Sequence, residues 1–355
     1  MKALAYLSVV CLFLCSACGR TGEKIMAEPY VFVPSGVNST IRTLPFDSLV
    51  TSDPFILADE EEHTYYLVAS GGAMWKSKDL ARWTGPYRYL EVDTTSWVGN
   101  NPWIWAPQLH KYKGKYYCFV TFTNPDIIVD TVPGRYKVQR RATQILMADQ
   151  AEGPYRALEG QNYFPESWST LDGTLWVEDG MPYMVFGHGW MQTVDGEICY
   201  LPLSADLAEA IGPSTLLFQA SDASWSADME EIGELTFGMM LNGHSADAPF
   251  LFRTGTGRLG MLWSGWGKQR CVQGVAYSAS GKLAGPWIQL DMPLVSDNSG
   301  HAMLFHTFEG KHLMLLHHQS LNMENPGPRR PRLFEVDASG DELKILRVYK
   351  PEASV

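Results

Sequence analysis

Three aspartates are the residues of this sequence best suited to chemistry. Asp53, Asp172 and Asp247 each open a short run that is typical of a buried β-strand, namely DPFIL, DGTLW and DAPFL. Carboxylates that a fold brings together repel and raise one another's pKa, so such a cluster indicates catalysis or cation binding more than stability. Asp before Pro or Gly is also a common turn residue, which is the alternative for each aspartate taken singly.

A repeat from about residue 45 onward predicts where these aspartates lie. Each unit has an apolar strand, then a turn and an aromatic strand, and then a strand that ends in a Ser/Ala-Asp turn, often with a Gly-Pro-aromatic corner. The five opening strands start at Asp53, Trp105, Asp172, Asp247 and Gly300. We therefore expect an all-β fold, a five-bladed β-propeller of four-stranded antiparallel blades with the opening strands innermost. A β-sandwich is the alternative, and it does not explain five matched units.

Composition restricts the classes of function. The 355 residues are 45% hydrophobic and 19% charged, so the chain can bury a sizeable core. A net charge of −11 disfavours binding to the negatively charged phosphate backbone of a nucleic acid, so we expect no nucleic-acid partner. Three cysteines of the body, Cys118, Cys199 and Cys271, have apolar neighbours and are odd in number, which predicts buried free thiols.

The N-terminus is typical of a targeting segment. Lys2 precedes an apolar stretch over residues 3–14, and Cys18 follows the small pair Ser16-Ala17. We interpret residues 1–18 as a lipoprotein signal peptide with Cys18 lipidated, residues 19–44 as an N-terminal segment, and residues 45–355 as the propeller catalytic domain. The protein is then an exported, membrane-anchored lipoprotein of a Gram-negative bacterium, in the periplasm or at the cell surface. Ordinary secretion with cleavage nearby is the alternative.

The ordered set of motifs resembles glycoside hydrolase family 43. The motifs are SDPFI at 52–56, WAP at 105–107, LDGTL at 171–175, DAPFL at 247–251 and GHAM at 300–303. The resemblance covers about residues 45–345 and implies an inverting five-bladed propeller enzyme. Its substrates would be plant polysaccharides or their oligosaccharide side chains. The expected activity is that of an α-L-arabinofuranosidase, or else of a β-xylosidase or a galactan-directed enzyme.

The same resemblance implies a role for each aspartate. Asp53 would be the general base, Asp172 would orient the acid and tune its pKa, and Asp247 would be the general acid. Inverting hydrolysis needs such a base and acid on opposite faces of the sugar. The family usually has Glu-Gly-Pro where this chain has DAP, but a subgroup carries Asp-Gly-Pro-Phe ahead of a run similar to RTGTGRLGMLW at 253–263.

Two departures from that subgroup leave a second function open. The subgroup tends to have Glu where this chain has Gln108 and Gly189. If the second of these were the true acid, the chain would be a catalytically weak or inactive surface glycan-binding lipoprotein. A retaining fructan hydrolase is disfavoured, because Ser52 rather than Asn precedes Asp53 and the chain has no Arg-Asp-Pro.

Aromatic and polar residues beside the inner strands complete the expected site. We expect the substrate to contact Trp105, Gln108, His188 and Trp190, although packing between blades is the alternative for each tryptophan. His301 opens the fifth inner strand, where the resemblance implies contact through water with a structural calcium on the propeller axis. No cofactor is expected to be required, no zinc motif is present, and the protein is expected to be a monomer whose only membrane contact is the lipid.

Overall fold

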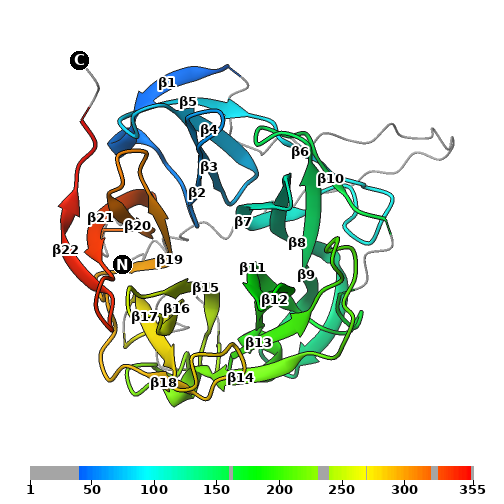
Figure 1. The fold of residues 1–355 in the computed structure, drawn as a ribbon. Coiled ribbons are helices and arrows are strands. Elements are labelled where there is room, and N and C mark those ends of the chain that lie inside the picture. The colour runs from blue at the N-terminus through cyan, green and yellow to red at the C-terminus, as the bar shows by residue number, and fades with distance from the viewer. Residues whose placement is uncertain (1–39, 160–162, 231–239, 269, 321–326, 353–355) are drawn as a thin grey trace, which may run out of the picture.

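A computed structural model of the chain confirms the predicted propeller. It describes residues 40–159, 163–230, 240–268, 270–320 and 327–352, and the expected signal peptide and the lipidated Cys18 lie outside these ranges. Five β-sheets surround a central axis, and successive sheets follow one another along the chain (Figure 1). Within the described ranges, no helix has the length and apolar character that a membrane crossing needs.

Each blade has a hairpin-linked antiparallel sheet whose first strand lies at the axis, as the repeat predicts. Blade I contains β2 (Phe55–Asp59), β3 (Thr64–Ala69), β4 (Ala73–Ser77), β5 (Arg82–Tyr87) and, outermost, β1 (Arg42–Pro45). Blade II contains β7 (Trp103–Tyr112), β8 (Lys115–Val132), β9 (Tyr136–Ala148), β10 (Tyr155–Ala157) and, outermost, β6 (Leu90–Glu91). Blade III contains β11 (Thr170–Glu178), β12 (Met181–His188), β13 (Glu197–Pro202) and β14 (Thr215–Gln219).

The last two blades have four strands each. Blade IV contains β15 (Asp247–Arg253), β16 (Leu259–Trp266), β17 (Cys271–Ser278) and β18 (Trp287–Gln289). Blade V contains β19 (Ser299–His306), β20 (His312–His318), β21 (Arg330–Asp337) and β22 (Lys344–Tyr349). The turns between strands are short, so each blade forms from local sequence and packs on the next through its apolar side chains.

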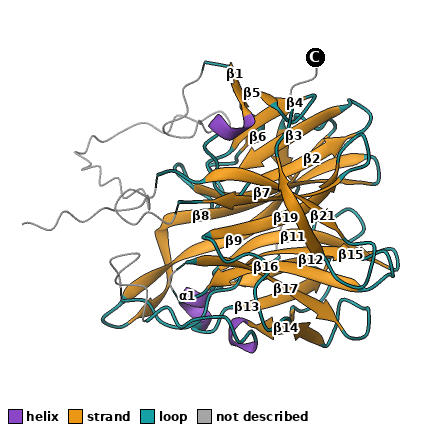
Figure 2. Cartoon of the chain, turned by 90° about the vertical axis from the view of Figure 1, so that its left-hand side faces the viewer, coloured by secondary structure: helices purple, strands orange, loops and turns teal. Residues whose placement is uncertain are grey.

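The structure differs from the sequence-based expectation in its edge strands. Blades I and II have five strands rather than four, because β1 pairs with β5, and β6 pairs in parallel with β10. The first sheet therefore takes in residues ahead of position 45. A single helical turn, α1 (Trp190–Thr193), follows blade III's second strand, and η1 (Phe46–Ser48) and η2 (Ala220–Asp222) are short 3-10 turns. In the side view, α1 lies toward the same side of the molecule as β8 (Figure 2).

The start of every inner strand has the same unusual backbone. One residue in each blade adopts a left-handed conformation: Asp53 (φ 56°), Ala106 (39°), Asp172 (55°), Ala248 (51°) and His301 (55°). In blades II to V the strand register shifts at this point, as in a β-bulge. Non-glycine residues in this conformation cost about 1–3 kcal/mol each, and such strain is concentrated at functional sites.

This repeat corrects the expected alignment of the aspartates. Asp53 and Asp172 occupy the left-handed position of their blades, but in blade IV that position belongs to Ala248. Asp247 comes one residue earlier, and its partner on the neighbouring strand is Ser264. The sequence carries this offset, because Pro follows Ala248 as it follows Asp53 and Ala106, and aligning the prolines sets Ala248 rather than Asp247 against Asp53.

Contacts between blades V and I close the ring. The backbone N–H of Thr51 donates to the carbonyl of Arg329 at 3.1 Å, and the guanidinium of Arg330 donates to the carbonyl of Asp47 at 3.0 Å. The N–H of Phe308 donates to the Tyr65 hydroxyl at 2.9 Å. These bonds join segments from the two ends of the fold and close the ring of blades.

The three cysteines of the body are buried and free, as predicted.

Candidate active site

The left-handed residues direct their backbone amides at the neighbouring blade. The amides of Asp53, Ala106, Asp172 and His301 donate to side chains in or directly after the preceding blade's second strand. The acceptors are His317 Nδ1 (3.2 Å), Ser70 Oγ (2.9 Å), Thr121 Oγ1 (2.8 Å) and Ser264 Oγ (2.7 Å), respectively. The bulges thus fix where each inner strand begins relative to its neighbour.

Blade III is the exception, and its difference involves a catalytic candidate. Its residue at the acceptor position is Gly187, which pairs with Leu171 and has no side chain to offer. The amide of Ala248 donates instead to Oδ2 of Asp172, at 3.1 Å. Asp172 therefore holds the backbone next to Asp247 in place.

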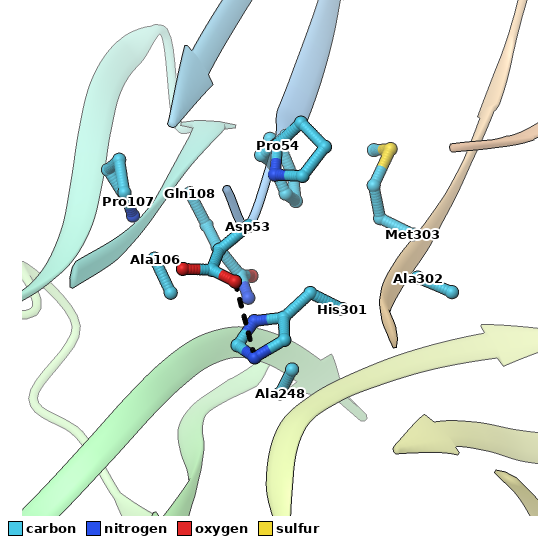
Figure 3. A pocket seen from close by; sticks show the side chains of 10 residues that line it. Asp53, Pro54, Ala106, Pro107, Gln108, Ala248, His301, Ala302 and Met303 are labelled. Atoms are coloured by element: carbon cyan, nitrogen blue, oxygen red, sulfur yellow. Dashed lines mark ion pairs between the residues drawn. The ribbon is translucent and has the colours of Figure 1, made fainter. Parts of the chain in front are cut away.

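Asp53 lies among a serine hydroxyl, two histidines and an arginine. Its Oδ2 accepts from Ser70 Oγ at 2.5 Å, and its Oδ1 lies 3.1 Å from His317 Nδ1 and 3.7 Å from Arg329 Nη1. The same Oδ1 lies 3.5 Å from His301 Nε2 (Figure 3). Burial alone would raise the pKa of Asp53, but His301, His317 and Arg329 together outweigh it and hold that pKa well below its usual range. Asp53 is therefore a carboxylate able to accept a proton.

Asp172 is only 1% exposed and interacts electrostatically with Asp53 and Asp247. Its Oδ2 is 3.9 Å from His301 Nδ1, and its buried Oδ1 has no hydrogen-bond partner among the described residues. Burial and the negative charge of Asp53 raise the pKa of Asp172, against the opposing effects of His301, the Ala248 amide and Arg141.

Asp247 has the pKa of a proton donor. Burial first, and then the charge of Asp172, raise the pKa of Asp247 to about 7, while His301 and Arg141 oppose the rise. Its Oδ1 is buried and has no partner within the part of the chain that the structure describes. A carboxylic acid with a pKa near neutrality can protonate a leaving oxygen at the pH at which Asp53 is ionised.

Arg141 of blade II is a cation that interacts with Asp172 and Asp247, and the sequence did not single it out. It lies on β9, donates from Nε to Thr123 Oγ1 at 2.9 Å, and places its guanidinium 4.2 Å from the ring centre of Trp105. It interacts electrostatically with both Asp172 and Asp247. Trp105 is half-buried under this guanidinium, and Trp103 stacks beside it with ring centres 6.3 Å apart.

Gln108 is buried near Asp53, and its expected contact with substrate stays a prediction. It lines a cavity of about 10 Å³ on the axis together with Asp53, His301 and apolar neighbours (Figure 3). That volume holds about one water molecule. The Oε1 of Gln108 is buried and lacks a partner among the described residues, so it is the polar atom that such a water would contact.

The residues on the axis do not fit a calcium ion bound directly by the protein. Calcium takes six to eight oxygen ligands, whereas both nitrogens of His301 face carboxylates and the void beneath it has the amide of Gln108 as a further polar group. Within the described residues, no group of three or more His, Cys, Asp or Glu side chains is placed to hold a metal ion. The calcium bound through water stays a prediction, and no catalytic step below uses it.

The remaining candidates lie at the blade III end of the site. His188 is 9% exposed, and both of its ring nitrogens face side chains of the protein, while its contact with substrate stays a prediction. Trp190 begins α1 and packs on an apolar cluster that contains Tyr136 and Leu241. A Cβ at Gly189 would lie 2.9 Å from the carbonyl of Ser169, so a larger residue there requires the backbone to shift.

Four residues that contact or influence the carboxylates were not assigned a role from sequence. They are Ser70, Arg141, His317 and Arg329. His317 stands in a histidine-rich stretch, which is the one signal that the sequence offered. The other three belong to no motif, because their function depends on contacts between blades that are distant in the chain.

A five-bladed propeller whose axis carries a low-pKa carboxylate beside a carboxylic acid of raised pKa is the architecture of a glycoside hydrolase. The sequence model described as glycosyl hydrolases family 43 matches residues 43–342. The chain belongs to this family and is an O-glycosyl hydrolase.

Solved structures agree with this assignment. An endo-arabinase from Bacteroides thetaiotaomicron is 31% identical, with a TM-score of 0.70 over 87% of this chain and 99% of that one. An endo-1,4-beta-xylanase from Bacteroides thetaiotaomicron (19% identity, TM-score 0.64, 88% and 99% coverage) shares the fold. So does an alpha-L-arabinofuranosidase from Lactobacillus brevis (15%, 0.59, 83% and 93%). No curated protein matches the sequence.

Proposed function

We propose that the chain hydrolyses glycosidic bonds of plant-type polysaccharides or their oligosaccharide side chains by inversion, with α-L-arabinofuranosides as the favoured substrates. The observation that carries this proposal is the pairing of Asp53, whose pKa is held low, with Asp247, whose pKa is about 7. Support for the arabinose preference comes from the 31% identity to an endo-arabinase. Xylosides and galactans are the next candidates.

The proposed reaction is a single displacement. Asp53 takes a proton from a water molecule as the water oxygen attacks the anomeric carbon, and the bond to the leaving oxygen breaks on the opposite face of the sugar. Asp247 gives its proton to that leaving oxygen, and the configuration at the anomeric carbon inverts. Asp172 keeps a negative charge next to Asp247 and so favours the protonated form of the acid before the reaction.

Substitution of the base tests this proposal. Asp53→Asn keeps size and hydrogen bonding but cannot accept a proton, and general base catalysis contributes about 10²–10⁴-fold. Hydrolysis of arabinofuranose, xylose and galactose oligosaccharides should fall by that factor while the circular dichroism spectrum shows that the variant stays folded, although its melting temperature should fall because the stabilising carboxylate is gone. Turnover close to that of the wild type on a natural oligosaccharide would refute the role of Asp53.

The same panel separates the enzyme from a glycan-binding lipoprotein. If the wild type binds oligosaccharides in calorimetry yet cleaves none of the panel, the protein is a glycan-binding lipoprotein and the proposed hydrolysis is refuted. This alternative outcome is tested because positions 108 and 189 carry Gln and Gly rather than Glu.

We also propose that the protein is a monomer tethered through a lipid on Cys18. The support is the sequence of residues 1–18. In cells, Cys18→Ala should move the protein out of the membrane fraction. If the variant stays membrane-bound, or if the wild type is soluble, the tether is absent.

A further inference from the structure

A glutamine side chain clamps the backbone on both sides of one tryptophan, Trp168. Gln192 donates from Nε2 to the carbonyl of Ser167 at 2.7 Å and accepts at Oε1 from the N–H of Ser169 at 2.8 Å. The carbonyl of Ser169 in turn accepts from the N–H of Gly189 at 2.8 Å. The main chain that carries Trp168 is therefore fixed by three hydrogen bonds from the segment around α1.

The ring of Trp168 is fixed as well. It stacks on His188 with ring centres 4.3 Å apart and an angle of 15° between the planes. His188 is held by Glu197, with Nδ1 to Oε2 at 3.0 Å, and by Gln192, with Nε2 to Oε1 at 3.3 Å. His188 is buried, whereas Trp168 is partly exposed.

Trp168 lies close in the chain to a catalytic candidate. It lies just before β11, the inner strand that carries Asp172. Its neighbour Ser169 forms a parallel bridge with Arg141, the residue that covers Trp105 and acts on Asp172 and Asp247. Trp105 and Trp168 thus flank the same seam between blades II and III.

We propose that Trp168 is a sugar-stacking platform that binds a ring of the oligosaccharide outside the catalytic subsite, on the side of blades II and III. The C–H face of a sugar ring is apolar and packs well on an indole. Because the backbone, ring and supporting histidine are all held in advance, binding on this platform costs little side-chain entropy. The inference rests on the proposed function and adds a binding subsite to it.

The test compares Trp168→Ala and Trp168→Phe with a matched control, Trp176→Ala. Trp176 is another half-buried tryptophan and lies farther along β11, beneath the guanidinium of Arg253. Initial rates are measured on an aryl arabinofuranoside and on linear arabino-oligosaccharides of increasing length. Trp168→Ala should raise KM for the longer oligosaccharides about tenfold, or about 1.4 kcal/mol, with kcat unchanged. KM for the aryl glycoside should not change, and Trp168→Phe should recover part of the loss.

Three results would overturn the inference. These are an equal rise in KM for the aryl glycoside and the long oligosaccharides, an unchanged KM for all of them, or the same effect from Trp176→Ala.

Calorimetric binding of the oligosaccharides distinguishes this inference from the proposed function. If the wild type binds without cleaving and Trp168→Ala weakens binding about tenfold, the platform stands and the hydrolase proposal fails. If the wild type cleaves and Trp168→Ala binds normally, only the platform fails. If the wild type neither binds nor cleaves, both fail.

Discussion

Replacement of Asp247 by asparagine should remove the alkaline limb of the pH–rate profile. With a pKa of about 7, Asp247 is protonated in about 90% of molecules at pH 6, about half at pH 7 and about 10% at pH 8. Because only the protonated form can donate, the wild-type kcat/KM should fall about fivefold between pH 7 and pH 8. The amide of an asparagine does not titrate over this range, so Asp247→Asn should show no such fall.

Leaving-group dependence is the second half of this prediction. Without the acid, a natural oligosaccharide should lose about 10²–10⁴-fold in rate. An aryl glycoside needs less protonation of its leaving oxygen and should lose much less. The assay measures kcat/KM for both substrates from pH 5 to pH 9, on wild type and variant. An alkaline limb that persists in Asp247→Asn, or an equal loss on both substrates, would refute the assignment of Asp247 as the acid.

Two further predictions follow from the same charges. Arg141 lowers the pKa of Asp247, so Arg141→Gln should move the alkaline limb to higher pH while Arg141→Lys leaves it in place; a profile unchanged in Arg141→Gln would contradict this. The raised pKa of Asp247 also means that the contribution of this residue to folding stability falls as the pH rises from the ordinary pKa of 3.8 to about 7. The melting temperature of Asp247→Asn relative to wild type should therefore increase from pH 4 to pH 7 and then level off, and a pH-independent difference in differential scanning calorimetry would count against it.

The blades were predictable from sequence because their signals are local. A turn residue before an aromatic run indicates a hairpin from local sequence alone. Examples are Gly114-Lys115-Tyr116 and Gly310-Lys311-His312. The edge strands β1 and β6 are short and pair with distant segments, so local sequence signals could not show which sheet each one joins.

The candidate site was predictable only in part, because its details depend on contacts between blades. Asp53 and Asp172 stand out at the start of apolar strands, whereas the one-residue offset of Asp247 is visible only when the prolines after Asp53 and Ala248 are aligned. His317 and Arg329 approach Asp53 across the closure of the ring. Because both residues are more than 250 positions away from Asp53 in the chain, the sequence does not indicate these contacts.

The anomeric configuration of the first product tests the central claim most directly. If Asp53 activates water while Asp247 protonates the leaving oxygen, the sugar leaves with its configuration inverted. Proton NMR during the first minutes of hydrolysis, before mutarotation mixes the anomers, should show the inverted anomer accumulating first. Initial release of the retained anomer would mean that a carboxylate attacks the sugar as a nucleophile, and it would contradict the roles assigned to both aspartates.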